Sequence, residues 1–214
     1  MITNKKIVLT GANSGIGYEV LKLLAAEKTN RILAVDINGD KINGFADNVI
    51  PLICDVSSKE NVDMIFSKAE ELFGQIDVFY ANAGYPYYEI MDYTDWDRTA
   101  RMFETNVYSP IYSYQKYVKH LNGADGHFAI TVSAIGKMAM PGFTTYSASK
   151  FAMEGFQQGI RFELPKNVKL TCLYPIATDT NFFAAANKEK FERPFPVQSP
   201  AVVAKKMVKG ILSL

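Results

Sequence analysis

The stretch KIVLTGANSGIGYEVLKLLAAEK, residues 6–28, carries the clearest signal of the fold class. A short apolar run over 6–11 predicts a buried strand, and the apolar spacing over 15–28 predicts a helix directly after it. A glycine-rich turn between them lets the backbone approach a pyrophosphate, and the helix N-terminus adds unpaired amides and a positive dipole end. Gly11, Gly15 and Gly17 follow the spacing G-x-x-x-G-x-G. Such a cluster can also serve a tight turn, so its place at the opening of a βαβ unit is what favours dinucleotide binding.

The same alternation of buried strands and amphipathic helices continues along the chain. Strands are expected at residues 6–11, 31–36, 49–55, 76–84, 127–134 and 168–175. Helices are expected at residues 15–28, 58–74, 96–120, 146–164 and 199–212, with a short helix-like stretch after residue 36. This pattern predicts an α/β fold with a doubly wound, Rossmann-like parallel sheet in strand order 3-2-1-4-5-6. We expect a single domain over 1–214, a substrate flap at about 177–198, and no seventh strand, because the chain stops at Leu214 within or just after the last helix.

Composition excludes several classes of protein. The 214 residues are 48% hydrophobic and 21% charged with a net charge of +1, which is typical of one globular domain. The sequence has no basic stripe of the kind that binds nucleic acid or an anionic membrane. No apolar run is long enough to span a bilayer. The N-terminal segment does not resemble a signal peptide, so a cytoplasmic location is expected. Cys54 and Cys172 belong to strands at opposite sheet edges and are interpreted as buried thiols. His120 and His127 are too few to build a metal site, so no metal is expected.

A carboxylate ends the second predicted strand, about twenty residues beyond the glycines. Asp36 can accept both ribose hydroxyls of an adenosine and would repel a 2′-phosphate, and no lysine or arginine lies just after it. The sequence therefore favours NAD over NADP, although an aspartate that begins a loop is common. Asp55, after the third strand, is expected near the adenine, and residues 82–84, after the fourth strand, near a ribose. Turn chemistry alone is the alternative for both.

Together these features resemble the classical short-chain dehydrogenase/reductase family, from Lys6 to about Thr180. The motifs that carry the resemblance are TGANSGIG at residues 10–17, Asp36, Asp55-Val56, ANAG at residues 81–84, Asn106, Ser133, and YSASK at residues 146–150. The resemblance implies an oxidoreductase that interconverts a secondary alcohol and a carbonyl by hydride transfer with NAD, or less readily NADP. The dinucleotide-binding residues that it implies are Gly11, Asn13, Ser14, Gly15, Ile16, Gly17, Asp36, Ile37, Asp55, Val56, Asn82, Ala83, Gly84, Tyr146, Lys150, Ile176, Thr178 and Thr180.

The resemblance assigns catalysis to Asn106, Ser133, Tyr146 and Lys150. A carbonyl that accepts a hydride needs a proton on its oxygen, and an alcohol that loses one needs a base. The phenol of Tyr146, with an ordinary pKa near 10, would need a pKa about 3 pH units lower, or roughly 4 kcal/mol. A cation about 4 Å away at an effective dielectric near 20 supplies about that much, and Lys150 lies one helical turn on. By resemblance Lys150 also binds the nicotinamide ribose, Ser133 holds the substrate oxygen, and Asn106 orders a water. Pro110 predicts a distortion of that helix.

Each of these residues has an ordinary structural alternative. Ser133 could be a strand-end hydroxyl and Asn106 a helix cap, and only their joint spacing with Tyr146 favours catalysis. Tyr112 and Lys116 match the same Y-x-x-x-K pattern, but no serine ends a strand upstream, so we expect a surface or subunit-contact role for them. A non-catalytic dinucleotide-binding sensor or scaffold subunit is the alternative function. A sugar-nucleotide epimerase is a further option, which the short C-terminal part disfavours.

Substrate and assembly are predicted only coarsely. The pocket is expected to be apolar or aromatic-tolerant for a small alcohol or carbonyl, with Lys137 as the one nearby charge. Its expected lining residues are Tyr85, Pro86, Tyr87, Tyr88, Met138, Met140, Phe143, Ile176, Phe182 and Phe183. Ile176 stands where the family often has glycine. The strand at 168–175 would be an exposed edge, so a covering element or partner subunit is expected, and we predict a homodimer through the helices at 96–120 and 146–164.

Overall fold

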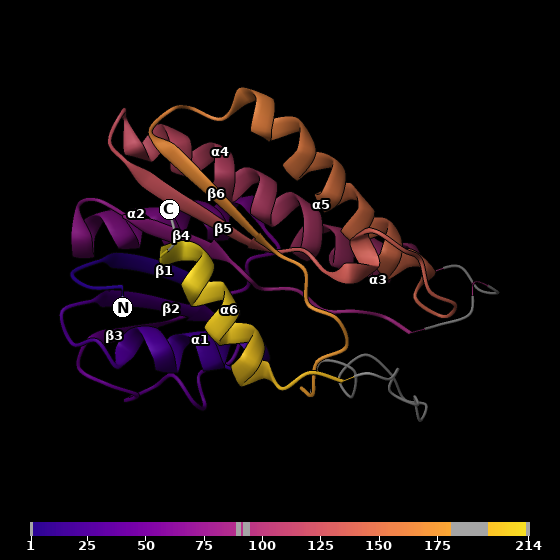
Figure 1. Ribbon diagram of the computed structural model, residues 1–214, viewed down its shortest axis with the longest axis horizontal. Helices are drawn as coiled ribbons and strands as arrows, with labels where there is room; N and C mark the ends of the chain where they lie inside the picture. Colours follow the sequence, from indigo (N-terminus) through magenta and orange to yellow (C-terminus); the bar gives the residue numbers. More distant parts are fainter. Residues whose placement is uncertain (1, 89–90, 92–94, 181–196, 213–214) are drawn as a thin grey trace.

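The computed structural model describes residues 2–88, 91, 95–180 and 197–212. Six strands form one parallel sheet in the order β3-β2-β1-β4-β5-β6 (Figure 1). The strands are β1 (Lys6–Thr10), β2 (Arg31–Asp36), β3 (Val49–Ile53), β4 (Val78–Ala81), β5 (Gly126–Thr131) and β6 (Val168–Leu173). The predicted fold class and strand order are confirmed, and the described part of the chain contains no seventh strand.

Helices cover both faces of this sheet (Figure 1). They are α1 (Gly15–Ala25), α2 (Lys59–Phe73), α3 (Trp96–Phe103), α4 (Ser109–Leu121), α5 (Thr144–Glu163) and α6 (Pro200–Leu212), with short π and 3₁₀ segments at η1 (Glu104–Tyr108) and η2 (Ala134–Gly136). Alternate side chains of each strand point to opposite faces. In β1, Ile7 and Leu9 pack in the core beneath α1 and α6, whereas Val8 packs in the core beneath α2, α4 and α5. Burial on both faces explains why the strands read as nearly continuous apolar runs.

The connection between β2 and β3 differs from the prediction. The helix-like stretch expected there is wrong, because residues 37–48 form successive turns. The N–H groups of Ile42 and Asn43 both donate to the carbonyl of Gly39, at 3.2 Å and 3.0 Å. Two Asn-Gly pairs fall in this short segment, and Gly44 has a φ of 66°. Asparagine and glycine favour tight turns over helix, and this local preference outweighed the polar periodicity.

The long helix predicted at 96–120 is present but is interrupted. A π-helical segment, η1, separates α3 from α4. The N–H of Ser109 donates to the carbonyl of Glu104, five residues back. Pro110 has no N–H to offer the preceding turn, which agrees with the predicted distortion. The bulge carries Asn106 into the interior, where the residue is 2% exposed.

The predicted flap at 177–198 lies mostly outside the described residues, since 181–196 are not described. Its two ends meet. Thr178 and Gln198 form a parallel bridge, in which the N–H of Gln198 donates to the carbonyl of Ala177 at 2.7 Å. The flap and the single domain over 1–214 stay predictions. Cys54, just after β3, is a free buried thiol as predicted, whereas Cys172 of β6 is free but only partly buried. The two strands lie at opposite edges of the sheet.

Candidate active site

A cleft of about 920 Å³ opens at the carboxyl ends of the strands. It lies where the strand order reverses between β1 and β4, the usual place for a ligand in an open α/β sheet. Most of the predicted site residues share this cleft, namely Gly11, Ser14, Gly15, Ile16, Asp36, Ile37, Asp55, Val56, Asn82, Ala83, Gly84, Ser133, Tyr146, Lys150, Ile176, Thr178 and Thr180. Asn13, Gly17 and Asn106 are not lining residues and lie behind the wall.

The turn between β1 and α1 requires glycine, because of its backbone conformation and because neighbouring atoms lie where a Cβ would be. Gly11 and Gly15 have φ values of 69° and 53°, in the left-handed region that favours glycine. A Cβ on Gly17 would lie 1.9 Å from the carbonyl oxygen of Gly11, so helix α1 packs directly against the turn. A Cβ on Gly15 would lie 3.2 Å from the side chain of Thr180, which therefore reaches across the cleft to the turn.

Asp36 is held in place by backbone donors at the carboxyl end of β2. Its Oδ2 accepts from the N–H of Asn13 at 2.9 Å, and its Oδ1 accepts from the N–H of Asn38 at 3.0 Å. The side chain of Asn13 in turn accepts from the N–H of Lys41 at 2.7 Å. Asn13 thus orients Asp36 rather than facing the cleft. At the end of β3, Oδ1 of Asp55 accepts from the N–H of Ser57 at 2.9 Å.

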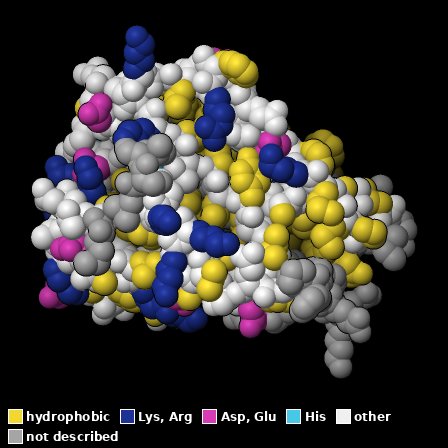
Figure 2. Space-filling view, in the orientation of Figure 1, with side chains coloured by type: hydrophobic (Ala, Val, Ile, Leu, Met, Phe, Trp, Pro, Cys, Tyr) yellow, Lys and Arg dark blue, Asp and Glu magenta, His cyan; other side chains and the backbone are white. Residues whose placement is uncertain are grey.

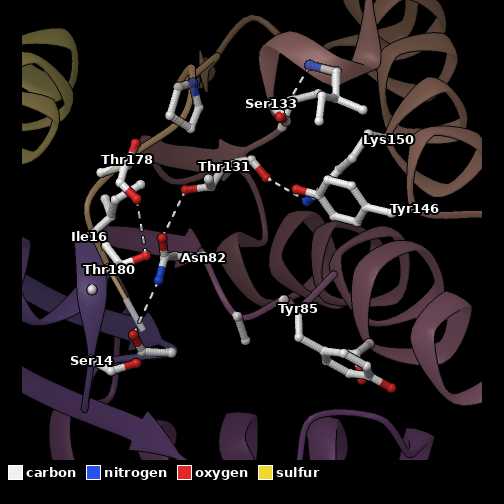
Figure 3. Close-up of a pocket in the computed structure, with 18 of the residues that line it drawn as sticks. Ser14, Ile16, Asn82, Tyr85, Thr131, Ser133, Tyr146, Lys150, Thr178 and Thr180 are labelled. Atoms are coloured by element: carbon white, nitrogen blue, oxygen red, sulfur yellow. Dashed lines mark hydrogen bonds between the residues drawn. The ribbon is translucent and has the colours of Figure 1, made fainter. Parts of the chain in front are cut away.

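The side chain of Asn82 joins three strand ends (Figure 3). Its Nδ2 donates to the carbonyls of Thr10 and Gly11 at 3.1 Å and 3.2 Å, and its Oδ1 accepts from the Thr131 hydroxyl at 2.9 Å. Thr131 also shares a 2.6 Å hydrogen bond with the Tyr80 hydroxyl. Sequence reasoning missed Thr131, although a hydroxyl at the very end of β5 was a usable signal. These bonds fix the spacing of β1, β4 and β5 under the cleft.

Ser133, Tyr146 and Lys150 come together at one end of the cleft, while Ser14 of the glycine turn lies at the other (Figure 3). Ser133 follows β5, and its hydroxyl accepts from the N–H of Ile135 at 3.2 Å. Tyr146 and Lys150 lie one turn apart near the start of α5 and are 3% and 5% exposed. The Lys150 ammonium is 5.7 Å from the centre of the Tyr146 ring and donates to the carbonyl of Thr131 at 3.4 Å.

Burial disfavours the charged forms of both titrating groups. It raises the pKa of the Tyr146 phenol above its ordinary value, and a hydrogen bond with Ser133 offsets part of that rise. Burial also lowers the pKa of Lys150 to about 8. The direction for Tyr146 is opposite to the sequence expectation of a lowered pKa. The expectation counted the lysine charge, whereas desolvation of a phenol enclosed by Met102 and Phe143 is the larger effect.

Asn106 supports the wall rather than lining it. Its Oδ1 accepts from the N–H of Tyr85 at 3.1 Å, and its Nδ2 donates to the carbonyl of Tyr85 at 2.9 Å and to the Ser149 hydroxyl at 3.2 Å. A Cβ on Gly84 would lie 3.0 Å from Oδ1 of Asn106 and 3.8 Å from Nζ of Lys150. The amide thus stands close behind Gly84, on the side where the Lys150 ammonium ends.

The end of the cleft near Tyr146 is lined mainly by apolar side chains, but the charged side chain there belongs to a different residue from the one predicted. Of the expected lining residues, those that line the cleft are Tyr85, Met138, Met140, Phe143 and Ile176. Pro86, Tyr87 and Tyr88 do not line it, and Phe182 and Phe183 lie outside the described residues.

The expectation that Lys137 is the nearby charge is wrong. Its ammonium pairs with Glu154 at 3.2 Å and lies 4.9 Å from the Tyr174 ring centre, away from the cleft. Arg101 and Thr105 line the cleft instead. No linear pattern marks them, because the rotation of α3 and of the π-helical segment η1 decides which of their side chains face the cleft.

Hydrophobic side chains gather on the visible face towards the end of the molecule where α3 and the start of α5 lie (Figures 1 and 2). Met138, which lines the cleft, is 62% exposed. A cleft that opens beside exposed apolar side chains suits an organic substrate with an apolar part.

The second Y-x-x-x-K match has a structural role. The Tyr112 hydroxyl donates to Oδ1 of Asp63 at 2.8 Å, and the Lys116 ammonium pairs with the same oxygen at 2.8 Å. Both bonds tie α4 to α2, and neither Tyr112 nor Lys116 lines the cleft. Lys59 also bonds this carboxylate, and these donors together hold the pKa of Asp63 well below its ordinary value.

The described residues contain no group of three or more histidine, cysteine or acidic side chains placed to hold a metal ion. His127 instead shares a 2.8 Å hydrogen bond with Thr171, and burial lowers its pKa to about 4. None of the helices in the described ranges is both long and apolar enough to cross a membrane.

Comparison with known proteins identifies the family. The model of the short chain dehydrogenase family matches residues 5–190. The chain belongs to this family. It is 34% identical over 197 residues to an uncharacterized oxidoreductase, SA2266, of Staphylococcus aureus strain N315, with 87% of this chain and 84% of that protein covered. It is 30% identical over 224 residues to an uncharacterized oxidoreductase, YxnA, of Bacillus subtilis strain 168. That alignment covers 99% of this chain but only 62% of the longer relative.

Solved structures of similar fold extend the comparison. An alcohol dehydrogenase from Thermococcus sibiricus, solved with 5-hydroxy-NADP, superposes with a TM-score of 0.84 at 25% identity, over 98% of this chain and 91% of that one. A 3-ketoacyl-(acyl-carrier-protein) reductase from Brucella melitensis, solved with NADH, superposes with a TM-score of 0.86 over 97% of this chain and 91% of that one. Its identity is 21%, so that likeness concerns the fold alone.

Proposed function

We propose that this protein is a nicotinamide-dinucleotide-dependent oxidoreductase that interconverts a secondary alcohol and a carbonyl, with Tyr146 as the general acid and base. The observation that carries the proposal is the convergence of Ser133, Tyr146 and Lys150 at one end of a cleft whose other end is a glycine turn. Family membership and the relatives named as oxidoreductases support it. A sensor that only binds the dinucleotide would gain nothing from an enclosed phenol beside an ammonium.

The shape of the turn fits a dinucleotide. A Cβ would meet backbone atoms at Gly11 and Gly17 and the Thr180 side chain at Gly15. The Ser14 side chain makes no capping hydrogen bond at the start of α1, so its first amides can serve a phosphate. Those three glycines with Ser14 and Ile16 would hold the pyrophosphate. Two of the similar proteins were solved with NADH and with a modified NADP, which supports a dinucleotide of this class.

Further cleft residues would complete the dinucleotide site. Asp36 and Ile37 would take the adenosine ribose, Asp55 and Val56 the adenine, and Asn82, Ala83 and Gly84 the backbone wall along the ribose. Ile176, Thr178 and Thr180 would enclose the nicotinamide end. When bound there, the nicotinamide gives or accepts the hydride.

The protein's own residues would handle the proton. Because burial raises the pKa of Tyr146, the phenol stays protonated at neutral pH and can donate its proton to a carbonyl oxygen held by Ser133. Oxidation of an alcohol needs the phenolate, which the Lys150 ammonium stabilises. Lys150 would also hold the nicotinamide ribose, and Asn106 would order a water behind Gly84 that passes the proton outward.

Asp36 favours NAD over NADP. Each of its carboxylate oxygens accepts one backbone N–H and keeps a lone pair for a ribose hydroxyl. A 2′-phosphate would meet this negative charge. NADH should therefore raise the melting temperature more than NADPH does, and Asp36→Ala should erase the difference. Equal stabilisation of the wild type by both would contradict this assignment.

The deciding experiment compares two matched substitutions. NAD⁺ reduction and NADH oxidation are measured with a broad mixture of alcohols and carbonyls in the wild type, in Tyr146→Phe and in Tyr112→Phe. Both variants remove one phenol from a Y-x-x-x-K pattern, but only Tyr146 lines the cleft. We expect Tyr146→Phe to lose at least about 100-fold in turnover, on the scale of general acid catalysis. Tyr112→Phe should keep wild-type turnover.

NADH binding is measured first in all three proteins, so that lost turnover is not confused with lost binding. Tight NADH binding without turnover in any of them would favour the sensor. Equal turnover in the wild type and Tyr146→Phe would contradict the assigned acid. Tyr112→Phe that loses turnover as fully as Tyr146→Phe would contradict the structural role of the second match.

A homodimer is the assembly that the surface supports. The outward face of α5 presents Phe151 and Phe162, which are 45% and 94% exposed. Small residues lie between them on the same face, and Gly155 and Gly159 have open space where a side chain would be. Such a face suits close packing against a second copy. Phe162→Asp should give a monomer by light scattering, while Val202→Asp, at an exposed valine of α6, should stay a dimer. A monomeric wild type would refute the proposal.

A further inference from the structure

One wall of the cleft carries a cation that the proposed chemistry does not use. Arg101 of α3 lines the cleft, as does Thr105, which follows α3 in the π-helical segment η1. Tyr85 lines the cleft beside them. The guanidinium lies near enough for its charge to act on the Tyr85 phenol, which has the hydroxyls of Tyr87 and Thr105 as hydrogen-bonding neighbours. A guanidinium and two hydroxyls thus meet at one place.

The charge of Arg101 is not neutralised within the described part of the chain. The ion pairs found in residues 2–88, 91, 95–180 and 197–212 use other cations. The second arginine of α3, Arg98, stacks on the Tyr87 ring at 3.8 Å, and Lys137 is bound to Glu154. A guanidinium flanked by hydroxyls is a suitable partner for a carboxylate, which its planar fork can bind through two parallel hydrogen bonds.

The position of Arg101 separates it from the phosphates of a dinucleotide. Its neighbour along α3, Met102, is buried in one cluster with Phe143 and Tyr146. This cluster fixes α3 against the catalytic end of the cleft, whereas the glycine turn and Asp36 form the other end. An anion at Arg101 therefore belongs to the molecule that reacts at Tyr146.

We propose that the substrate is an oxo or hydroxy compound that carries a carboxylate, which Arg101 binds with the hydroxyls of Tyr85 and Thr105 while the reacting oxygen lies at Tyr146. A single guanidinium matches a single negative charge, and the apolar part of such a molecule would lie on Met138 and Met140. The inference rests on the proposed function and names the substrate class of that same site.

The test uses pairs of ketones that differ in one carboxylate. NADH-dependent reduction is measured for 4-acetylbenzoate against 4-methylacetophenone, and for 5-oxohexanoate against 2-hexanone. In the wild type, kcat/KM should be about 10-fold to 100-fold higher for the carboxylate member of at least one pair, the range expected of a charged hydrogen bond. Arg101→Gln should bring that ratio close to one, and Arg101→Lys should keep part of it. Lys137→Gln makes the same change in net charge and should leave the ratio as in the wild type.

Each outcome bears on the proposal. A wild type without preference for the carboxylate, or a preference that survives in Arg101→Gln, overturns it. If no ketone turns over, calorimetry with 4-acetylbenzoate on the NADH-loaded protein separates this inference from the proposed function. Binding that weakens about tenfold in Arg101→Gln but not in Tyr146→Phe supports the carboxylate site even though the oxidoreductase has failed. Absent binding, or equal weakening in both variants, overturns it.

Discussion

Removal of the buried ammonium should stabilise the protein while it abolishes turnover. Lys150 is 5% exposed, and burial lowers its pKa from 10.5 to about 8. At 1.36 kcal/mol per pH unit, this shift means that keeping Lys150 charged in the folded state reduces the free energy of unfolding by roughly 3 kcal/mol at pH 7. Lys150→Met also removes the long hydrogen bond to the Thr131 carbonyl, worth about 1 kcal/mol or less. The net expectation is a gain of about 2 kcal/mol at pH 7.

The pH dependence of this gain gives the sharper test. Below about pH 8 the lysine is charged in both states, so the full penalty is present. Between about pH 8 and 10.5 the unfolded chain binds a proton that the folded protein has lost, so wild-type stability rises with pH. The stability difference between Lys150→Met and wild type should therefore shrink from about 2 kcal/mol at pH 7 to near or below zero above pH 10.

Urea unfolding of both proteins at pH 7, 8.5 and 10, at one fixed protein concentration, measures this difference. Lys137→Met is the matched control, because the Lys137 side chain is 59% exposed and its ammonium is paired, so the substitution should bring no gain. The reasoning is refuted if Lys150→Met is no more stable than the wild type at pH 7. It is also refuted if a gain at pH 7 persists unchanged at pH 10, since the gain would then not come from a buried charge.

Three further outcomes are expected. The rate of carbonyl reduction with NADH should fall as pH rises through about 8, because Lys150 loses its proton there, and a flat profile between pH 7 and 9 would contradict a need for the ammonium. Gly17→Ala should lower the free energy of unfolding by about 1–3 kcal/mol and weaken NADH binding, because the new Cβ would lie 1.9 Å from the carbonyl oxygen of Gly11. An unchanged melting temperature and an unchanged affinity for NADH would contradict this tight contact. Thr131→Val keeps the shape of the side chain but leaves Oδ1 of Asn82 without its donor, so the free energy of unfolding should fall by about 1–3 kcal/mol. Denaturation that matches the wild type would show that the hydroxyl does not hold the strand ends together.

The general layout of the site could be predicted from the sequence alone. Alternation of buried strands and helices predicts a doubly wound parallel sheet, and in such a sheet all strands have their carboxyl ends on the same side. Residues that follow strands, such as the glycines of residues 11–17, Asp36 and Ser133, must then meet there whatever the details of packing. For the same reason Tyr146 could be told apart from Tyr112, since only Tyr146 begins a helix directly after a strand-end serine.

The orientation of the side chains and their contacts, in contrast, could be known only from the three-dimensional packing. Arg101 faces the cleft and Lys137 turns away from it because of the rotation of α3 and the position of Glu154, neither of which is written in a linear pattern. The opposing pKa shift of Tyr146 arises from enclosure by residues distant in sequence. Thr131 became a junction of three strands only when their register was known. Topology follows from local periodicity, whereas contacts, burial and charge depend on packing between elements, which no single segment encodes.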